Sequence, residues 1–329
     1  MAEDRPSKIV YLFGAGATHA ELQNLAPVLA EEQGLLVSHV SSRVIERARR
    51  EPGYIKDVDT VSDTSGSLNI ELLISLIENS KIRGWEHKTR RLKDLVKRDI
   101  ESVLTAPRTS RFYLHKALFE LHEHQAIRKK EELTGLISLN YDNVLDSAYK
   151  EYYGRPRYCF SLDTDQAVMA GIPLLKLHGS FSWKNQTIRG RQRTIEIIPL
   201  GSTKNYIHPP YGCIWNQAFE TLVGCDTLRV IGCSLSPNDF HLIDLLFKAH
   251  LERGKAFELE IIASDKVGDD IRRTYGFFPG ISSLTEIKGI LIPETAPANP
   301  FKAWLRYRSL ALLDAKEISQ TRYIKRIVR

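Results

Sequence analysis

Two short stretches decide the fold of this chain: Ser138-Leu139-Asn140-Tyr141-Asp142 and, further along, Lys176-Leu177-His178-Gly179-Ser180. Each begins within a short apolar run and ends in polar residues. Apolar runs of this length, bounded by turn residues, are typical of buried strands in parallel sheets. In open α/β sheets the functional side chains follow the carboxyl ends of the strands. We therefore expect Asn140, Asp142 and His178 to meet in one crevice.

A third motif stands near the start of the chain. Lys8–Phe13 is rich in β-forming residues and predicts the first strand. It runs into Gly14-Ala15-Gly16-Ala17-Thr18, and helix-like sequence follows from His19. Glycines let backbone N–H groups approach a phosphate, and a helix start favours negative charge. The pattern predicts a phosphate-binding turn, although it also suits a plain tight turn, because the third glycine of the dinucleotide fingerprint is missing.

Two more predicted strands end in polar residues. Thr227–Ile231 is followed by Gly232-Cys233-Ser234, and Phe257–Ala263 runs into Ser264 and Asp265. An acid at a strand end accepts hydrogen bonds from ribose hydroxyls in dinucleotide-binding folds. Between the two strands, Ser236-Pro237-Asn238-Asp239 predicts a helix start, with Ser236 as the N-cap residue.

These elements predict an α/β protein with a Rossmann-like parallel sheet and helices on both faces. Residues 1–18 and 131–295 would form the Rossmann-like catalytic domain. Residues 19–130 show helical periodicity and predict a helical insertion module between the first and second strands. Residues 296–329 predict a helical, basic C-terminal tail.

The formal net charge of +6 and the pI near 9.0 favour anionic partners, such as nucleotides or nucleic acid. The basic segment 88–98 predicts a solvated helical face, with a nucleic-acid or protein contact as the alternative. The first residues include acids and no apolar stretch, and no apolar run approaches the roughly 20 residues that span a membrane. We therefore expect a cytoplasmic protein with no membrane contact.

The four cysteines, Cys159, Cys213, Cys225 and Cys233, contain no Cys-x-x-Cys pair. This spacing argues against a zinc ribbon and predicts no metal site. Reduced thiols in a cytoplasm are the simpler explanation.

The order of four motifs resembles the sirtuin-like family. That family carries a glycine–alanine–glycine turn, an Asn-x-Asp after the next strand, a His-Gly after the following strand, and a Gly-x-Ser near the end. The corresponding residues here are Gly14–Thr18, Asn140–Asp142, His178-Gly179 and Gly232–Ser234, within residues 8–265. The residues within these motifs, including the Gly-x-Ser-Leu-Ser-x-x-Asp run from Gly232, are more similar to those of the bacterial anti-phage branch than to those of protein deacylases.

The resemblance implies that NAD⁺ is the substrate and that the reaction is its hydrolysis to nicotinamide and ADP-ribose. Asn140 would orient the ribose and an attacking water, His178 would act as general base, and Asp142 would bind the carboxamide of nicotinamide or hold the site in shape. The dinucleotide would contact the following residues: Gly14, Ala15, Gly16, Ala17, Thr18, Gly232, Ser234 and Asp265.

The resemblance also implies a role in bacterial defence through NAD⁺ depletion. The expected partners are further copies of the chain and a HerA-family ATPase or translocase, with nucleic acid involved at most indirectly. A chain with little beyond the catalytic domain fits a subunit whose sensor is another protein. Two polar segments, 57–67 and 183–212, are candidates for a loop that gates the site.

Three other interpretations stay open. The same NAD site would serve ADP-ribosyl transfer or cyclisation. Lysine deacylation is a second alternative, although deacylase sirtuins hold a four-cysteine zinc module after the catalytic histidine, where this chain has only the 183–212 segment. The third is a nucleic-acid-binding or assembly subunit without enzymatic activity, motivated by the net charge of +6 and the basic 88–98 segment.

Overall fold

The structure is a computed structural model of the chain. It describes residues 5–51, 69–105, 107, 109–160, 171–183, 186–188, 191–193, 197, 209–236, 239–254, 258–263, 267, 270–271, 287–289 and 299–328. The predicted gating segment 57–67 lies outside the described residues, as does most of 183–212.

A six-stranded sheet forms the centre of the protein, in the order β3-β2-β1-β6-β7-β8, and each pair of neighbours is parallel. Its strands are β1 (Ser7–Phe13), β2 (Glu131–Ser138), β3 (Leu174–Lys176), β6 (Thr227–Ile231), β7 (Glu258–Ile262) and β8 (Ile287–Gly289). A separate antiparallel ribbon joins β4 (Gln186–Ile188) to β5 (Arg191–Arg193). The predicted parallel sheet is therefore confirmed.

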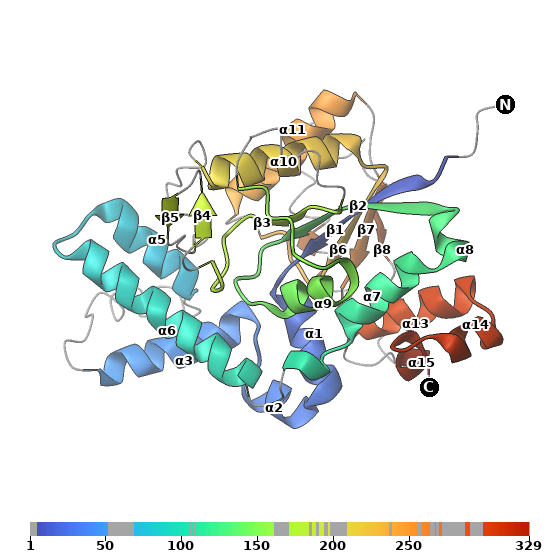
Figure 1. The fold of residues 1–329 in the computed structure, drawn as a ribbon. Coiled ribbons are helices and arrows are strands. Elements are labelled where there is room, and N and C mark those ends of the chain that lie inside the picture. Colours follow the sequence, from blue (N-terminus) through green and yellow to red (C-terminus); the bar gives the residue numbers. More distant parts are fainter. Residues whose placement is uncertain are drawn as a thin grey trace.

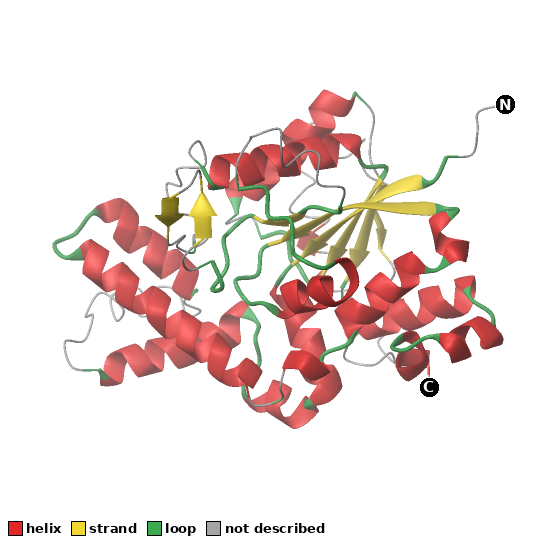
Figure 2. Cartoon of the chain, in the orientation of Figure 1, coloured by secondary structure: helices red, strands yellow, loops and turns green. Residues whose placement is uncertain are grey.

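Helices cover both faces of this sheet (Figures 1 and 2). The helices are α1 (Ala15–Leu25), α2 (Pro27–Glu32), α3 (Val37–Arg50), α5 (Ile70–Ser80), α6 (Trp85–Thr105), the 3₁₀ turn η1 (Thr109–Arg111), α7 (Leu114–Glu123), α8 (Gln125–Arg128), α9 (Val144–Tyr153), α10 (Tyr211–Gly224), α11 (Phe240–Arg253), α13 (Pro300–Leu312), α14 (Ala315–Gln320) and α15 (Ile324–Val328). Val10 and Leu12 of β1 face the core beneath α10 and α11, whereas Ile9, Tyr11 and Phe13 face the core beneath α7, α9 and α13. The alternation of side chains along a strand thus places helices on both faces.

Two kinds of helix lie within residues 19–130. Helices α3, α5 and α6 share a core of their own, with Val44, Leu73 and Leu92 fully buried. Helix α7, in contrast, packs on the sheet through residues such as Phe119. Tyr141, from the loop after β2, lies in the core of α3, α5 and α6 and joins it to the sheet edge. The predicted domain boundaries stay a prediction; the packing separates these three helices from those that cover the sheet.

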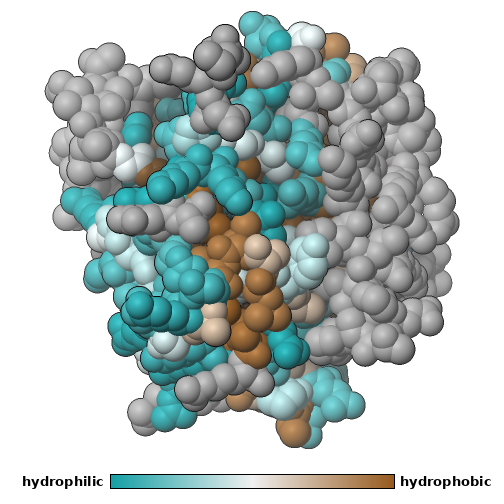
Figure 3. All heavy atoms as spheres, turned by 90° about the vertical axis from the view of Figure 1, so that its right-hand side faces the viewer, coloured by the Kyte–Doolittle hydropathy of each residue, from teal (hydrophilic) through white to brown (hydrophobic). Residues whose placement is uncertain are grey.

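The C-terminal helices are docked on the sheet. Trp304 of α13 and Ile324 of α15 are buried in the same core as β1. The carboxylate of Glu120 accepts hydrogen bonds from the backbone N–H groups of Tyr323 and Ile324, at 2.7 and 2.8 Å, at the start of α15. Figure 3 shows the side of the molecule that carries these helices, where hydrophilic side chains surround a small apolar group.

Part of the basic segment of α6 pairs with acidic residues of the protein itself. Lys93 lies 2.7 Å from Glu78 of α5, and Lys97 lies 3.5 Å from Glu101 one turn along. Lys97 also sits over the ring of Phe181, 5.8 Å from its centroid. The solvated-face and nucleic-acid interpretations of the whole segment stay predictions. Among the described helices, none combines the length and the apolar character needed to cross a membrane.

Candidate functional site

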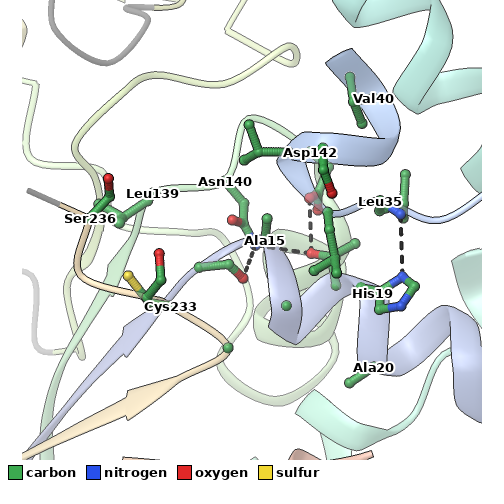
Figure 4. Close-up of a pocket in the computed structure, with 18 of the residues that line it drawn as sticks. Ala15, His19, Ala20, Leu35, Val40, Leu139, Asn140, Asp142, Cys233 and Ser236 are labelled. Atoms are coloured by element: carbon green, nitrogen blue, oxygen red, sulfur yellow. Dashed lines mark hydrogen bonds between the residues drawn. The ribbon is translucent and has the colours of Figure 1, made fainter. Parts of the chain in front are cut away.

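A cavity of about 570 Å³ lies at the carboxyl edge of the sheet (Figure 4). Asn140 and Asp142 reach it from the end of β2, His178 from the end of β3 and Ser234 from the end of β6. The start of α1 forms another part of its wall. The volume lies in the range of about 300–1,000 Å³ that small-molecule sites occupy. The structure therefore brings four separately predicted motifs to one cavity.

Asn140 ties the loop after β2 to the turn after β1. Its side-chain Nδ2 donates to the backbone carbonyl of Gly14 at 2.9 Å and to the hydroxyl of Thr18 at 3.0 Å (Figure 4). Its backbone N–H donates to the hydroxyl of Ser138 at 3.2 Å. The amide plane is therefore held from one end, through its nitrogen.

Asp142 is held through both carboxylate oxygens. Oδ2 accepts from the hydroxyl of Thr18 at 2.9 Å, and Oδ1 accepts from the backbone N–H of Val144, also at 2.9 Å. The second contact is the short loop that Asp residues form with the backbone two positions on. The N-cap position of α9 belongs to Asn143, so Asp142 stands one residue before it. Asp142 thus connects the starts of α1 and α9 across the cavity wall.

His178 is almost completely buried, with 1% of its surface exposed. Its Nε2 lies 3.0 Å from Oδ2 of Asp239, an ion-pair distance when the imidazole is protonated. The rings of Tyr141 and Trp215 lie against it edge-on, with centroids 6.5 and 6.3 Å away. Trp215 also donates from Nε1 to the carbonyl of Leu177 at 3.1 Å, which fixes the residue before His178.

Asp239 is the site residue that the sequence analysis missed. The prediction that Ser236 caps the following helix is wrong: α11 begins at Phe240, Asp239 is its N-cap residue, and Oδ1 of Asp239 accepts from the N–H of Leu242 at 3.3 Å. The carbonyl of Ser236 instead accepts from the N–H of Asp239 at 2.9 Å, in a turn before the helix. The available signal was the acid that ends the Gly-x-Ser-Leu-Ser-x-x-Asp run.

Lys176, another residue without a predicted role, lies beneath the site and is fully buried. Its Nζ donates to the backbone carbonyl of Asp142, to the carboxylate of Asp146 at 2.8 Å and to the hydroxyl of Ser180 at 3.0 Å. These bonds connect the loop after β2 with the turn after β3. Asn140 and His178 are therefore carried by two segments that share one buried cation.

The glycines of the first turn pack against the turn after β6. The N–H of Gly16 donates to the carbonyl of Gly232 at 2.8 Å, and Gly232 has a φ of +59°. A Cβ atom on Gly232 would lie 2.2 Å from the backbone nitrogen of Ala17. Real side chains do not tolerate that distance, so the close approach of the two turns requires glycine there.

Three of the five amides predicted to bind phosphate already donate within the protein. Gly14 donates to the carbonyl of Ile231, Gly16 to that of Gly232 and Ala17 to that of Gly14. Ala17 is also fully buried and does not line the cavity. A phosphate at this turn would therefore rely on amides other than these three and on the positive end of α1.

Asp265, the predicted ribose contact, lies outside the described residues. Ser234 is exposed and lines the cavity, and Gly232 lines it through its backbone. Among the described residues, no group of three or more His, Cys, Asp or Glu is arranged to hold a metal ion.

The described wall of the cavity is acidic. Its lining residues include Glu71, Asp142 and Asp239 and contain neither Lys nor Arg among those described. Glu71 comes from α5 and accepts a hydrogen bond from the hydroxyl of Tyr141 at 2.9 Å. Burial, helped by neighbouring His39, lowers the pKa of His19 to about 4, so this lining residue adds no positive charge at neutral pH. Such a wall is complementary to a cationic group.

Comparison with solved structures finds similarity to Sir2 proteins. A Sir2 structure with a deacetylated p53 peptide and 3′-O-acetyl ADP-ribose has a TM-score of 0.43 at 13% identity, over 93% of each chain. A Sir2Tm structure bound to a propionylated peptide has a TM-score of 0.39 at 11% identity, also over 93% of each chain. A Sir2 homolog–NAD complex has a TM-score of 0.30 at 13% identity, over 81% of this chain and 89% of that chain.

These values are too low for an activity to be inferred from them. No protein-family model matches the sequence, and no curated protein does.

Proposed function

We propose that this protein hydrolyses NAD⁺ to nicotinamide and ADP-ribose. The observation that carries the proposal is the meeting of Asn140, Asp142 and His178 with the first turn around one acidic cavity of about 570 Å³. The resemblance of these motifs to the sirtuin-like family suggests the dinucleotide, and the charge of the cavity suits the chemistry. Neither argument depends on a zinc module.

The acidic wall suits cleavage of the nicotinamide–ribose bond. The nicotinamide ring of NAD⁺ is positively charged, and positive charge moves onto the ribose as the bond to the ring nitrogen breaks. Carboxylates near a sugar cation stabilise it, as in glycoside hydrolysis. Glu71, Asp142 and Asp239 would supply that field, and the described lining has no Lys or Arg to oppose it.

Asn140 and His178 would position and activate the water. Both hydrogen bonds from the Asn140 amide use Nδ2, which leaves the carbonyl oxygen Oδ1 to accept from a ribose hydroxyl or from water. His178 would take the proton of the attacking water, directly or through a ribose hydroxyl. A general base in position contributes about 10²–10⁴-fold in rate.

The test is nicotinamide release from NAD⁺ by the purified protein and its variants. His178→Ala should lower turnover by about 10²-fold or more, and Asn140→Ala should show a loss of similar size because water and ribose lose their orientation. His87→Ala is the matched control, because His87 is an exposed histidine of α6 away from the cavity lining. Parental rates in both site variants would contradict the proposal.

Product analysis by mass spectrometry belongs to the same experiment. Free ADP-ribose supports hydrolysis, whereas cyclic ADP-ribose or a modified protein supports cyclisation or transfer at the same site. Release of acetyl groups from an acetyl-lysine peptide would support deacylation. Salt-sensitive DNA binding without any NAD⁺ turnover would favour the non-enzymatic assembly subunit.

We further propose that the activity serves bacterial anti-phage defence by depleting NAD⁺, in a homo-oligomer or together with a HerA-family ATPase. This proposal is supported by the residue pattern of the motifs around Asn140, His178 and Gly232, which resembles that of the anti-phage branch. Bacterial cells that carry the parent chain should lose NAD⁺ after phage infection, whereas cells with His178→Ala should keep it. Addition of the candidate ATPase to the purified protein tests whether the site needs a partner to be active.

A further inference from the structure

Asp239 and His178 form a buried pair in the cavity wall. Asp239 is 2% exposed and His178 is 1% exposed, and the carboxylate Oδ2 lies 3.0 Å from the imidazole Nε2. The two residues come from different strand ends, after β6 and after β3, so their contact is a tertiary one. Both also line the cavity.

The carboxylate of Asp239 is itself held in place. The N–H of Asp239 donates to the carbonyl of Ser236 at 2.9 Å, and the N–H of Leu242 donates to Oδ1 at 3.3 Å. One oxygen therefore caps α11, and the other is left facing His178. The rings of Tyr141 and Trp215 pack edge-on against the imidazole and limit how far it can turn.

We propose that Asp239 is the positioning residue of His178: it holds the imidazole through Nε2, so that Nδ1 is the atom that takes the proton. The inference rests on the proposed hydrolysis of NAD⁺. A carboxylate beside one imidazole nitrogen determines which nitrogen carries the hydrogen, orients the ring and stabilises its protonated form. Nε2 and Oδ2 meet at ion-pair distance rather than in hydrogen-bond alignment, and such contacts tighten when substrate binds.

The water oxygen forms a bond to the ribose carbon, and the bond from that carbon to the nicotinamide nitrogen breaks. The bonding electron pair leaves with nicotinamide and neutralises its ring charge. The proton of the water moves to Nδ1 of His178, and the negative charge of Asp239 balances the imidazolium until the proton passes to solvent.

Substitutions at Asp239 separate positioning from helix capping. Asn and Ser are good N-cap residues, so Asp239→Asn and Asp239→Ser keep the cap of α11 and remove the charge. We expect kcat for nicotinamide release to fall about 10–100-fold, the effect typical of losing a partner that orients a reacting group. KM should stay within a few-fold of the parent value and the melting temperature should stay close to it.

Asp314→Asn is the matched control, because Asp314 caps α14 in the same way and lies outside the cavity lining. It makes the same chemical change at another helix start, and its kcat should equal the parent's. Parental kcat in Asp239→Asn, with the fold intact, would overturn the proposal.

A second measurement does not depend on activity. In protein with ¹⁵N-labelled histidine, the His178 signals are assigned by their loss in His178→Gln. The parent should show the hydrogen on Nε2, and Asp239→Asn should show a changed or mixed distribution between the two nitrogens. Unchanged signals would overturn the positioning role. If the parent releases no nicotinamide under any condition, the proposed hydrolysis fails, and the ring signals alone still decide whether Asp239 positions His178.

Discussion

Two regions of this protein bury charge in different ways. On the sheet face beneath α13, Arg229 of β6 is 2% exposed and lies 2.7 Å from both Glu131 and Glu260, and it donates to the hydroxyl of Tyr11 at 3.0 Å. Burial alone would raise the pKa of Glu131, but the hydrogen bonds and charges of Arg229 and Arg308 lower it to about 2. Charges in this network are balanced by their neighbours.

In the cavity at the carboxyl edge of the sheet, the acidic residues are not matched by basic residues of the described lining. Its described lining includes Glu71, Asp142 and Asp239 and contains neither Lys nor Arg. The nearby cation Lys176 lies beneath the site and pairs with Asp146, which is not part of the wall. Charge balanced inside the protein serves the fold, whereas the acids of the cavity lining lie where a cationic ligand would bind.

The largest effect is expected for Lys176→Met, because Lys176 serves both fold and site. Loss of its ammonium group leaves Asp146 buried without its cation, which costs about 3–5 kcal/mol of unfolding free energy. It also releases the carbonyl of Asp142 and the hydroxyl of Ser180, so the two site loops lose their common anchor. Activity per folded molecule should fall about 10²-fold, as for small displacements of reacting groups.

Urea unfolding and nicotinamide release measure the two consequences of Lys176→Met. Lys248→Met is the control, because Lys248 pairs with Asp244 at 2.7 Å on the exposed side of α11. An exposed pair of this kind contributes at most about 0.5 kcal/mol. A Lys176→Met protein with parental activity per folded molecule would show that the loops hold without the cation.

Arg229→Met should be comparably destabilising but should leave the activity of the folded protein intact. The substitution removes the buried Arg229 partner of Glu131 and Glu260, and only Glu131 keeps another cation, Arg308. We expect a loss of up to about 3–5 kcal/mol. The combination with Glu260→Gln should recover part of that loss, because Glu260 then carries no charge where Arg229 stood. Unfolding in urea gives the stability, and the rate at saturating NAD⁺ gives the activity. A loss of activity in the folded variant would mean that the two regions are coupled.

Gly232→Ala tests the close packing of the two turns at the cavity. The new Cβ would stand 2.2 Å from the backbone nitrogen of Ala17, at a φ of +59°. We expect a loss of about 2–5 kcal/mol, from the left-handed backbone and from the overlap together. Gly254 is the matched control, since its φ is +65° and a Cβ there meets nothing within 4 Å. Gly254→Ala should cost only about 1–2 kcal/mol. Equal losses in the two variants would contradict the packing argument.

The smallest effect concerns acid stability in the balanced network. Burial, followed by the charge of Arg229, lowers the pKa of His122 from 6.5 to about 3. Between these two values the unfolded chain binds a proton that the folded chain does not, so stability falls as the pH drops from 6.5 towards 3. Glu131, with its pKa lowered from 4.5 to about 2, adds a loss in the same direction below pH 4.5.

His122→Gln should therefore flatten the dependence of stability on pH between about 6.5 and 4, while Gln still offers an acceptor to the Tyr11 hydroxyl. Urea unfolding at a series of pH values gives the slope. His87→Gln, at an exposed position, should leave the slope as in the parent. An unchanged slope in His122→Gln would mean that His122 takes up its proton in the folded protein as readily as in the unfolded one.

The sequence determined the sheet and the placing of the motifs on it. Apolar runs with turn residues at their ends marked β1, β2, β6 and β7, and parallel pairing sends the ends of neighbouring strands to the same edge. That rule was enough to predict that Asn140, Asp142 and His178 meet. The separate core of α3, α5 and α6 was less visible, because helical periodicity shows that a face is buried but not what it is buried against.

Only the tertiary structure decided which polar groups partner one another. The pair of His178 and Asp239, the bonds of Lys176 and the use of the Gly16 amide by Gly232 join segments far apart in the chain. Local propensity allows either Ser236 or Asp239 to cap α11, because both residue types suit the position. Which one does so depends on the direction in which the chain leaves β6 and on the neighbours it meets there, and spacing along the sequence carries no information about either.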